Sequence, residues 1–334
     1  MKFVENIAAK IRSTMGGLPF FTQFRELLHI ANTQSRQLEK LNSKVDRAIA
    51  ALEKTITSDA DVAIGSLTLT QNILNVFIED QLTKSLYTNT KYADLKKLNR
   101  YEFQVYSQTG EDGILEEIFE RIGARNRFFV EFGAGNGLEN NTAYLLVKGW
   151  SGFWIEADAE ASKQIRGAFS APLAARQLSF RTAFITSENI ESMFLEAAVP
   201  EEPDLLSIDI DGNDYWVWKA IQAYRPRVVV IEYNALFREN TFWIMKYNPN
   251  AVWDKTCYQG ASLKSLERLG LSKGYKLVGC NFAGVNAFFV REDLVEDRFL
   301  APYTAENHYE PPRYHLIHRR MGHPRAFGEY SRDT

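Results

Sequence analysis

Three acids follow two short apolar runs in the second half of this 334-residue sequence. Asp209 and Asp211 stand two residues apart in "DLLSIDIDGND", and Glu232 closes the apolar run of "RVVVIEYN". If both runs are strands, the alternation of side chains places Asp209 and Asp211 on the same side of one strand end. Carboxylates grouped in this way could remove a proton from a hydroxyl, with Asp211 or Glu232 as the base and Asp209 orienting a ligand. Alternatively, all three bind Mg2+ or Mn2+, whose charge lowers the pKa of a coordinated hydroxyl.

A second group of candidate residues lies in "FVEFGAGNGLENN". Gly133, Gly135 and Gly137 follow an apolar run, and glycines at such a turn let backbone amides approach a ligand closely. Glu156 ends the next apolar run nineteen residues after Gly137, where an acid can accept hydrogen bonds from the ribose hydroxyls of an adenosine cofactor. A dinucleotide fingerprint requires another glycine where Leu138 stands, so the spacing disfavours such a cofactor.

The acid inside this stretch, Glu131, narrows the choice further. A carboxylate at the loop repels a pyrophosphate and attracts a cofactor that carries an ammonium and a sulfonium. S-adenosylmethionine carries both groups, and we therefore expect it as the cofactor.

Four segments, in order, resemble the class I S-adenosylmethionine-dependent methyltransferases of the FkbM type, which are associated with O-methylation of sugars and glycans. The segments are "SQTGEDGILEEIF", "FVEFGAGNGLENNTAYLLVKGWSGFWIEAD", "DLLSIDIDGNDYWVWKAI" and "VVVIEYN", and the resemblance extends over roughly residues 101–294. It implies methyl transfer to a sugar hydroxyl of lipopolysaccharide, capsule, a related polysaccharide or a sugar-containing metabolite. It also implies a cofactor site formed by Gln108, Glu131, Gly133, Gly135, Asn136, Asn141, Thr142, Glu156 and Asp209.

Two alternatives stay open within these motifs. In "SQTGEDGIL", Gln108, Glu111 and Asp112 could face the cofactor or acceptor pocket, or Thr109 or its neighbours could simply cap a helix that begins near Ile114. Asp214, after the acid pair, is expected to cap the helix "YWVWKAIQAY".

The elements that must position these residues begin near Tyr101, where apolar runs alternate with amphipathic windows. This pattern predicts an α/β fold, a doubly wound and mostly parallel Rossmann-like sheet. Five strands are expected in "RFFVEFG", "SGFWIEA", "LSFRTAF", "DLLSIDI" and "RVVVIEYN". A hairpin turning at Gly284 in "YKLVGCNFAGVNAFFVRE" is expected to complete the sheet.

The first hundred residues differ in character. Residues 1–20 predict a short amphipathic helix that docks on the protein or rests on a membrane surface. Residues 21–100 predict long helices, which form either a coiled coil that joins copies of the chain into a homo-oligomer or a hairpin packed on the chain itself. The seam of the coiled coil would be Leu38, Leu41, Val45, Ala48 and Leu52.

Two regions outside the motifs could contact an acceptor. A basic tail, residues 301–334 after the domain 101–300, contains His308, His315, His318 and His323. The tail could grip an anionic acceptor, with His308 or His315 as the base, or could be a solvated or docking segment. Trp243, Tyr247, Trp253 and Tyr258 could stack on a sugar or cover the core.

Composition restricts the remaining possibilities. A formal net charge of −3 gives no reason to expect a nucleic acid partner. Two cysteines without CxxC spacing, no signal peptide and no membrane span indicate a cytoplasmic protein, which the first helix could hold at the inner face of the membrane. Besides an enzyme transferring a methyl group, an NAD(P)-dependent sugar-modifying enzyme and a non-catalytic coiled-coil scaffold stay open.

Overall fold

The computed structural model describes residues 40, 43–47, 71, 74, 77, 81, 84, 88–314 and 325–328. The chain divides into two compact units, Met1–Asn75 and Val76–Thr334. In the first unit the described residues are helical, and Val45 is partly buried. The predicted helix of residues 1–20 and the other coiled-coil positions, Leu38, Leu41, Ala48 and Leu52, lie outside the described residues.

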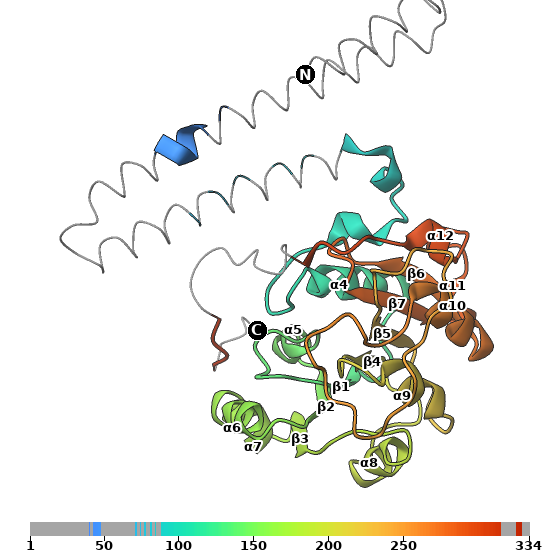
Figure 1. Cartoon of the computed structure of the whole chain (residues 1–334). Coiled ribbons are helices and arrows are strands. Elements are labelled where there is room, and N and C mark those ends of the chain that lie inside the picture. Colours follow the sequence, from blue (N-terminus) through green and yellow to red (C-terminus); the bar gives the residue numbers. More distant parts are fainter. Residues whose placement is uncertain are drawn as a thin grey trace, which may run out of the picture. The chain divides into compact units, whose positions relative to one another are not determined.

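The second unit contains a sheet of seven strands in the order β3-β2-β1-β4-β5-β7-β6 (Figure 1). The strands are β1 (Phe128–Phe132), β2 (Ser151–Glu156), β3 (Leu178–Thr182), β4 (Leu205–Ile208), β5 (Val228–Glu232), β6 (Tyr275–Cys280) and β7 (Asn286–Arg291). Strands β1 to β5 are parallel, whereas β7 runs antiparallel to both β5 and β6. This order, with its single reversed strand, is the Rossmann-like fold of class I methyltransferases, and the predicted fold class is confirmed.

Helices cover both faces of the sheet (Figure 1). One face packs against α4 (Glu111–Ile122), α5 (Ala143–Val147), α6 (Ala159–Ala168) and α7 (Ser170–Ala174); the other packs against α8 (Ile190–Glu196), α9 (Asp214–Ala220) and α10 (Leu263–Ser272). Alternate side chains of a strand serve the two cores: Phe129 joins one, while Val130 and Phe132 join the other. The short elements are η1 (Thr90–Tyr92), η2 (Leu98–Tyr101), α11 (Glu292–Val295) and α12 (Ala305–His308).

The compact unit extends beyond the predicted domain of residues 101–300 at both ends. Leu98 is fully buried in the core. Tyr92 Oη donates to the Glu310 carboxylate at 2.8 Å, and Lys97 Nζ donates to the Asn307 carbonyl at 2.8 Å. The segments before Tyr101 and after Leu300 therefore pack on one another and on the same domain.

Two helices have boundaries that the sequence pattern does not give. Helix α4 begins at Glu111 rather than near Ile114. Helix α9 ends at Ala220, because Ile221 is extended and the Glu191 carboxylate accepts the backbone N–H groups of the next two residues. Within the described ranges, none of the helices combines the length and apolar character needed to cross a membrane.

Candidate active site

The loop between β1 and α5 is fixed by glycines that serve different purposes. Gly133 has φ +75°, and a Cβ there would lie 1.4 Å from the Asp209 carbonyl oxygen. The end of β1 and the end of β4 therefore approach so closely that only glycine fits. Gly135 has φ +54° and no atom within 4 Å of a Cβ position, so this turn faces open space.

A cavity of about 220 Å³ opens at this loop, at the carboxyl ends of the parallel strands. In an open α/β sheet this edge is where ligands bind. The residues that line it are Gln108, Glu111, Glu131, Gly133, Ala134, Gly135, Asn136, Glu139, Asn140, Asn141, Asp209 and Asn286. Of the nine residues predicted to bind a cofactor, only Thr142 and Glu156 are not part of this lining.

Glu131 is buried at the end of β1 and receives four hydrogen bonds. The backbone N–H groups of Asn141 and Thr142 donate to it at 2.8 and 3.2 Å, the Thr142 hydroxyl donates at 2.5 Å, and the Ser207 hydroxyl at 3.1 Å. Burial raises the pKa of Glu131 to about 7, although these hydrogen bonds oppose the shift. Thr142 thus shapes the site indirectly, through Glu131.

Glu156 supports the same loop from the end of β2. Its carboxylate accepts the Gly135 N–H at 2.7 Å and the Asp158 N–H at 2.7 Å. Each carboxylate oxygen can accept a further hydrogen bond, so the position of Glu156 is compatible with ribose binding.

The start of α4 and the segment before it also line the cavity. Gln108 and Glu111 line the cavity, as one of the two alternatives expected. Asp112 instead accepts the backbone N–H groups of Val105, Tyr106 and Ser107 at 2.7 to 2.9 Å and holds the preceding loop. The other alternative holds for a neighbour of Thr109 and not for Thr109 itself: Gly110 is the N-cap of α4, and the Ser107 hydroxyl accepts the Asp112 N–H in the first turn at 3.1 Å.

Asn286, the first residue of β7, was not expected in the site. Its Nδ2 donates to the Glu111 carboxylate at 3.0 Å, and its Oδ1 is buried without a partner among the described residues. Asn140 likewise lines the cavity, and its Nδ2 has no partner in the described part of the chain. Two buried amide atoms of the lining thus lack a hydrogen-bond partner in the described part of the chain, the acceptor Oδ1 of Asn286 and the donor Nδ2 of Asn140.

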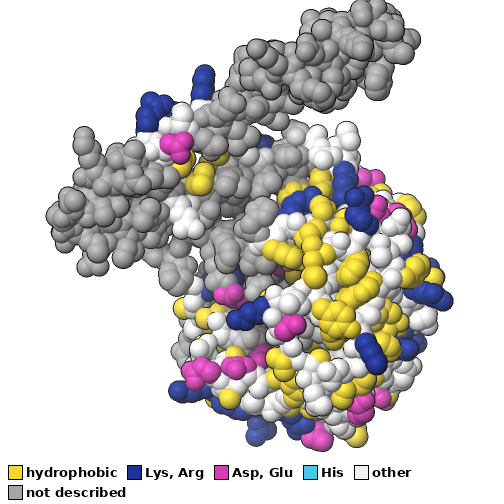
Figure 2. Space-filling view, in the orientation of Figure 1, with side chains coloured by type: hydrophobic (Ala, Val, Ile, Leu, Met, Phe, Trp, Pro, Cys, Tyr) yellow, Lys and Arg dark blue, Asp and Glu magenta, His cyan; other side chains and the backbone are white. Residues whose placement is uncertain are grey.

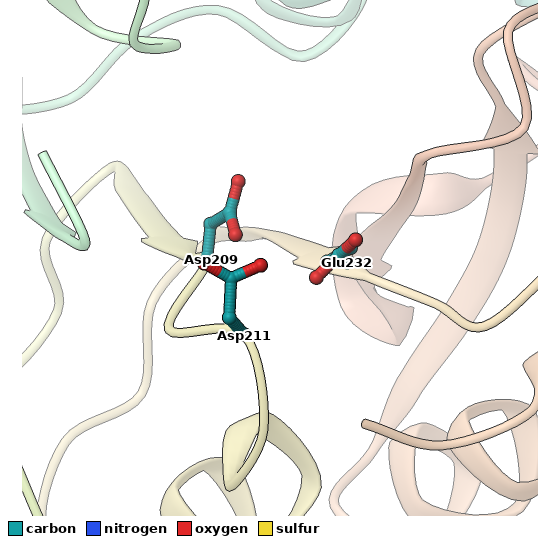
Figure 3. A group of neighbouring side chains, drawn as sticks. All are labelled: Asp209, Asp211 and Glu232. Atoms are coloured by element: carbon teal, nitrogen blue, oxygen red, sulfur yellow. The ribbon is translucent and has the colours of Figure 1, made fainter. Parts of the chain in front are cut away.

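The three predicted acids do meet. One ligand oxygen from each of Asp209, Asp211 and Glu232 lies within 4.8 Å of the others, at the ends of β4 and β5 (Figure 3). Asp209 and Glu232 are partly buried, whereas Asp211 is exposed. Gln259 Nε2 reaches the Glu232 carboxylate at 3.4 Å.

Crowding of these carboxylates alters their acidity. Burial and the Asp211 charge raise the pKa of Asp209 well above its usual range, and burial and Asp209 do the same for the pKa of Glu232. Burial, with Asp214 and Glu156 nearby, raises the pKa of Asp211 to about 6. The pKa of Asp211 lies below neutral pH, which makes Asp211 the candidate base of the cluster.

Asp214 holds the loop that carries Asp211. Its carboxylate accepts the N–H groups of Ile210 at 2.9 Å and Gly212 at 2.8 Å. It is the first residue of α9 rather than its N-cap, which is Asn213. These bonds hold the turn in which Asp211 adopts the uncommon φ of +53°.

His308, predicted as a possible base, does not lie in the cavity wall. Its ring is buried, Nε2 faces the Leu300 carbonyl oxygen at 3.1 Å, and burial lowers its pKa to about 3. A histidine held neutral in this way supports the fold instead of serving as the base, so that prediction is wrong for His308. His315, His318 and His323 lie outside the described residues.

Part of the tail does reach the site. Arg325 donates to the carbonyl oxygens of Ser107 at 3.0 Å and Leu138 at 3.3 Å, on the two segments that flank the cavity. The Phe327 ring lies 4.4 Å from that of Phe169. Residues 325–328 thus connect the segment before α4 with the glycine loop.

Comparison with known proteins shows similarity of fold alone. No protein-family model matches the chain, and no curated protein matches it in sequence. The N-terminal domain of EvdMO1 with SAH bound is 13% identical, with a TM-score of 0.35, and the match covers 64% of this chain and 95% of that one. The plantazolicin methyltransferase BamL, in complex with a triazolic desmethylPZN analog and SAH, is 10% identical, with a TM-score of 0.36 over 63% of this chain and 94% of BamL. Such low identities do not carry a neighbour's ligand over to this protein.

Proposed function

We propose that the protein is an S-adenosylmethionine-dependent O-methyltransferase of the FkbM type. Its acceptor is a hydroxyl of a sugar, in lipopolysaccharide, capsule, a related polysaccharide or a sugar-containing metabolite. The observation that carries the proposal is the acidic lining of the cavity: four acids, Glu111, Glu131, Glu139 and Asp209, line it, and no Lys or Arg is among the described residues of the lining. Such a lining favours a cationic cofactor and disfavours the pyrophosphate of NAD.

The cavity can accommodate the polar groups of the proposed cofactor. The ammonium and sulfonium would lie among the acids, and binding them would favour the ionised form of Glu131, whose pKa is about 7. The free Nδ2 of Asn140 is suited to donate to the methionine carboxylate. Glu156, beside Gly135, would accept the ribose hydroxyls.

The reaction follows from the place of Asp209, which belongs both to the cavity wall and to the carboxylate cluster. The acceptor oxygen forms a bond to the methyl carbon while the bond from that carbon to sulfur breaks. Sulfur keeps the electron pair and becomes a neutral thioether, and the hydroxyl proton passes to a carboxylate. Asp211 is the best base, because it is ionised at neutral pH and its raised pKa strengthens its affinity for the proton.

The same three carboxylates could instead bind Mg2+ or Mn2+, which would lower the pKa of the acceptor hydroxyl. Dialysis of the protein against a chelator separates the two routes. Loss of turnover that Mg2+ or Mn2+ restores supports metal-assisted transfer. Full turnover in excess chelator supports Asp211 as a direct base.

The enzymatic proposal is tested by transfer of a labelled methyl group from S-adenosylmethionine to a panel of glycans and sugars. Asp211→Ala should reduce turnover by roughly 100-fold or more, as expected on loss of a general base, and Glu232→Ala should also reduce turnover because it breaks the carboxylate cluster. Asp297→Ala, at a side chain 97% exposed in an ion pair elsewhere, is the matched control. Turnover that both site variants retain in full would contradict the assigned chemistry, and folded protein that transfers no methyl group would favour the scaffold alternative.

A further inference from the structure

The connection between β5 and α10, residues 233–262, is fastened beside the carboxylate cluster. Asn234 Nδ2 donates to the carbonyl oxygens of Cys257 at 2.8 Å and Gln259 at 3.0 Å. The Gly260 N–H donates to the Gly212 carbonyl at 3.1 Å, next to Asp211. The stretch 257–260 is therefore fixed against both acid-bearing strand ends.

Aromatic rings in this connection form an ordered stack. The rings of Phe237 and Trp243 are nearly parallel, with centroids 4.4 Å apart and an interplanar angle of 18°. Tyr258 meets Trp243 edge to face at 5.7 Å. Tyr258 is 57% exposed, so its ring is supported from one side and open on the other.

This surface is not merely a cover for the core. The connection supplies its own core residues, Tyr233 and Met245, which are buried. It also holds several large hydrophobic side chains in contact with solvent, namely Leu236, Phe242, Val252, Trp253 and Tyr258. Figure 2 shows hydrophobic side chains gathered on one face of the domain, next to acidic ones. Exposed apolar groups on a connection whose stretch 257–260 is fixed beside candidate catalytic acids indicate a binding surface.

A second exposed aromatic side chain, Tyr314, is influenced by the charge of Glu232. Tyr314 is 38% exposed, and burial raises the pKa of its phenol to about 12, with the Glu232 charge adding to the shift. Gln259, which bonds Glu232 through Nε2, has a buried Oε1 without a partner among the described residues. Gln259 therefore places an unpartnered hydrogen-bond acceptor next to Glu232, and Tyr258 directly precedes Gln259 in the chain.

Two of the four aromatics considered from the sequence serve other purposes. Tyr247 packs against Trp216 and donates to the Glu188 carboxylate, which fixes the connection to the loop before α8. Trp253 donates to the Thr256 carbonyl at 2.8 Å within its own turn. Of the four aromatics, Tyr258 and the Trp243 ring that supports it therefore remain as candidates to contact a ligand.

We propose that Tyr258, supported by Trp243 and Phe237, and Tyr314 form the acceptor subsite and bind the apolar face of a pyranose ring. A pyranose presents C–H groups on its faces and hydroxyls at its edge. The ring face stacks on Tyr258, while edge hydroxyls reach Gln259 Oε1, Glu232 and Asp211. This inference rests on the proposed function and adds the residues that select a sugar.

Saturation-transfer NMR on the full chain, without cofactor, tests the subsite. The probes are methyl β-D-glucopyranoside, methyl α-D-mannopyranoside and methyl α-L-fucopyranoside, with glycerol as a polyol that lacks a ring face. At least one glycoside should bind, with its axial ring protons saturated most strongly. Tyr258→Ala should weaken that binding roughly five- to tenfold, and Tyr258→Phe should preserve it.

Phe184→Ala, which removes an aromatic side chain 43% exposed after β3, is the matched control and should bind the glycoside normally. Equal affinity of Tyr258→Ala and wild type, or no binding of any of the three glycosides, would overturn the subsite. Calorimetry with S-adenosylhomocysteine on the same variants keeps the two proposals distinct. Failure to bind that ligand refutes the cofactor assignment alone, and loss of glycoside binding confined to Tyr258→Ala still supports the subsite.

Discussion

Replacing three glycines by alanine, one at a time, distinguishes a ligand-facing turn from a packing constraint. Gly133, Gly135 and Gly123 all have positive φ, at +75°, +54° and +67°. A Cβ at Gly133 would lie 1.4 Å from the Asp209 carbonyl oxygen, whereas a Cβ at Gly135 or Gly123 would meet no atom within 4 Å. Only Gly133 and Gly135 line the cavity.

The magnitudes follow from backbone strain and steric overlap. Alanine in the left-handed region loses about 1 to 2 kcal/mol, so Gly135→Ala and Gly123→Ala should lower the free energy of unfolding equally. Gly133→Ala adds an overlap with backbone that cannot rotate away, about 1 to 3 kcal/mol more. Its total of roughly 2 to 5 kcal/mol is a large part of the 5 to 15 kcal/mol typical of a domain.

Urea unfolding and calorimetry with S-adenosylmethionine measure the two effects separately. We expect Gly133→Ala to have a lower free energy of unfolding than Gly135→Ala and Gly123→Ala. We expect weakened cofactor binding in Gly135→Ala and unchanged binding in Gly123→Ala, because only the first methyl group enters the ligand space. Equal cofactor affinity of these two variants would refute the placement of the cofactor at Gly135.

Two further predictions concern the pH profile and the tail. The turnover number should rise about tenfold per pH unit below pH 6 and level off above pH 6. The reason is that the base must lose its proton, and the pKa of Asp211 is about 6. In a pH-rate series, Asp211→Asn should remove this dependence. Arg325→Ala should weaken S-adenosylmethionine binding by roughly tenfold, since hydrogen bonds from a charged group contribute about 1.5 to 3 kcal/mol. The same variant should exchange its backbone amide protons faster in the segments that flank the cavity. Arg298→Ala, whose guanidinium pairs with Glu296 instead, is the control for the tail variant, and identical affinity of the two variants would contradict the role of Arg325.

Local patterns predicted the part of the site that depends on strand ends. Each acid follows an apolar run, and parallel strands end at one edge of a sheet, so Asp209, Asp211 and Glu232 could be expected to meet. The glycine spacing likewise placed the turn after β1.

Residues whose role depends on distant partners escaped this reasoning. Asn286 enters the site because β7 pairs antiparallel with β5, in a register that sets it opposite Glu232. Nothing near Asn286 in the sequence signals that pairing. His308 looked like a candidate base in its sequence context, but packing buries its ring. Both cases depend on long-range packing, which periodicity and spacing do not reveal.

Calorimetric titration with S-adenosylmethionine, with NAD as the parallel ligand, tests the central claim most directly. Glu156→Ala should weaken S-adenosylmethionine binding by roughly tenfold or more, because a charged acceptor at the ribose is lost. Glu160→Ala, at an exposed acid of α6, should leave the affinity unchanged. Saturable binding of S-adenosylmethionine with this pattern, and no binding of NAD, is the predicted result; binding of NAD alone, or of neither ligand, would contradict the account.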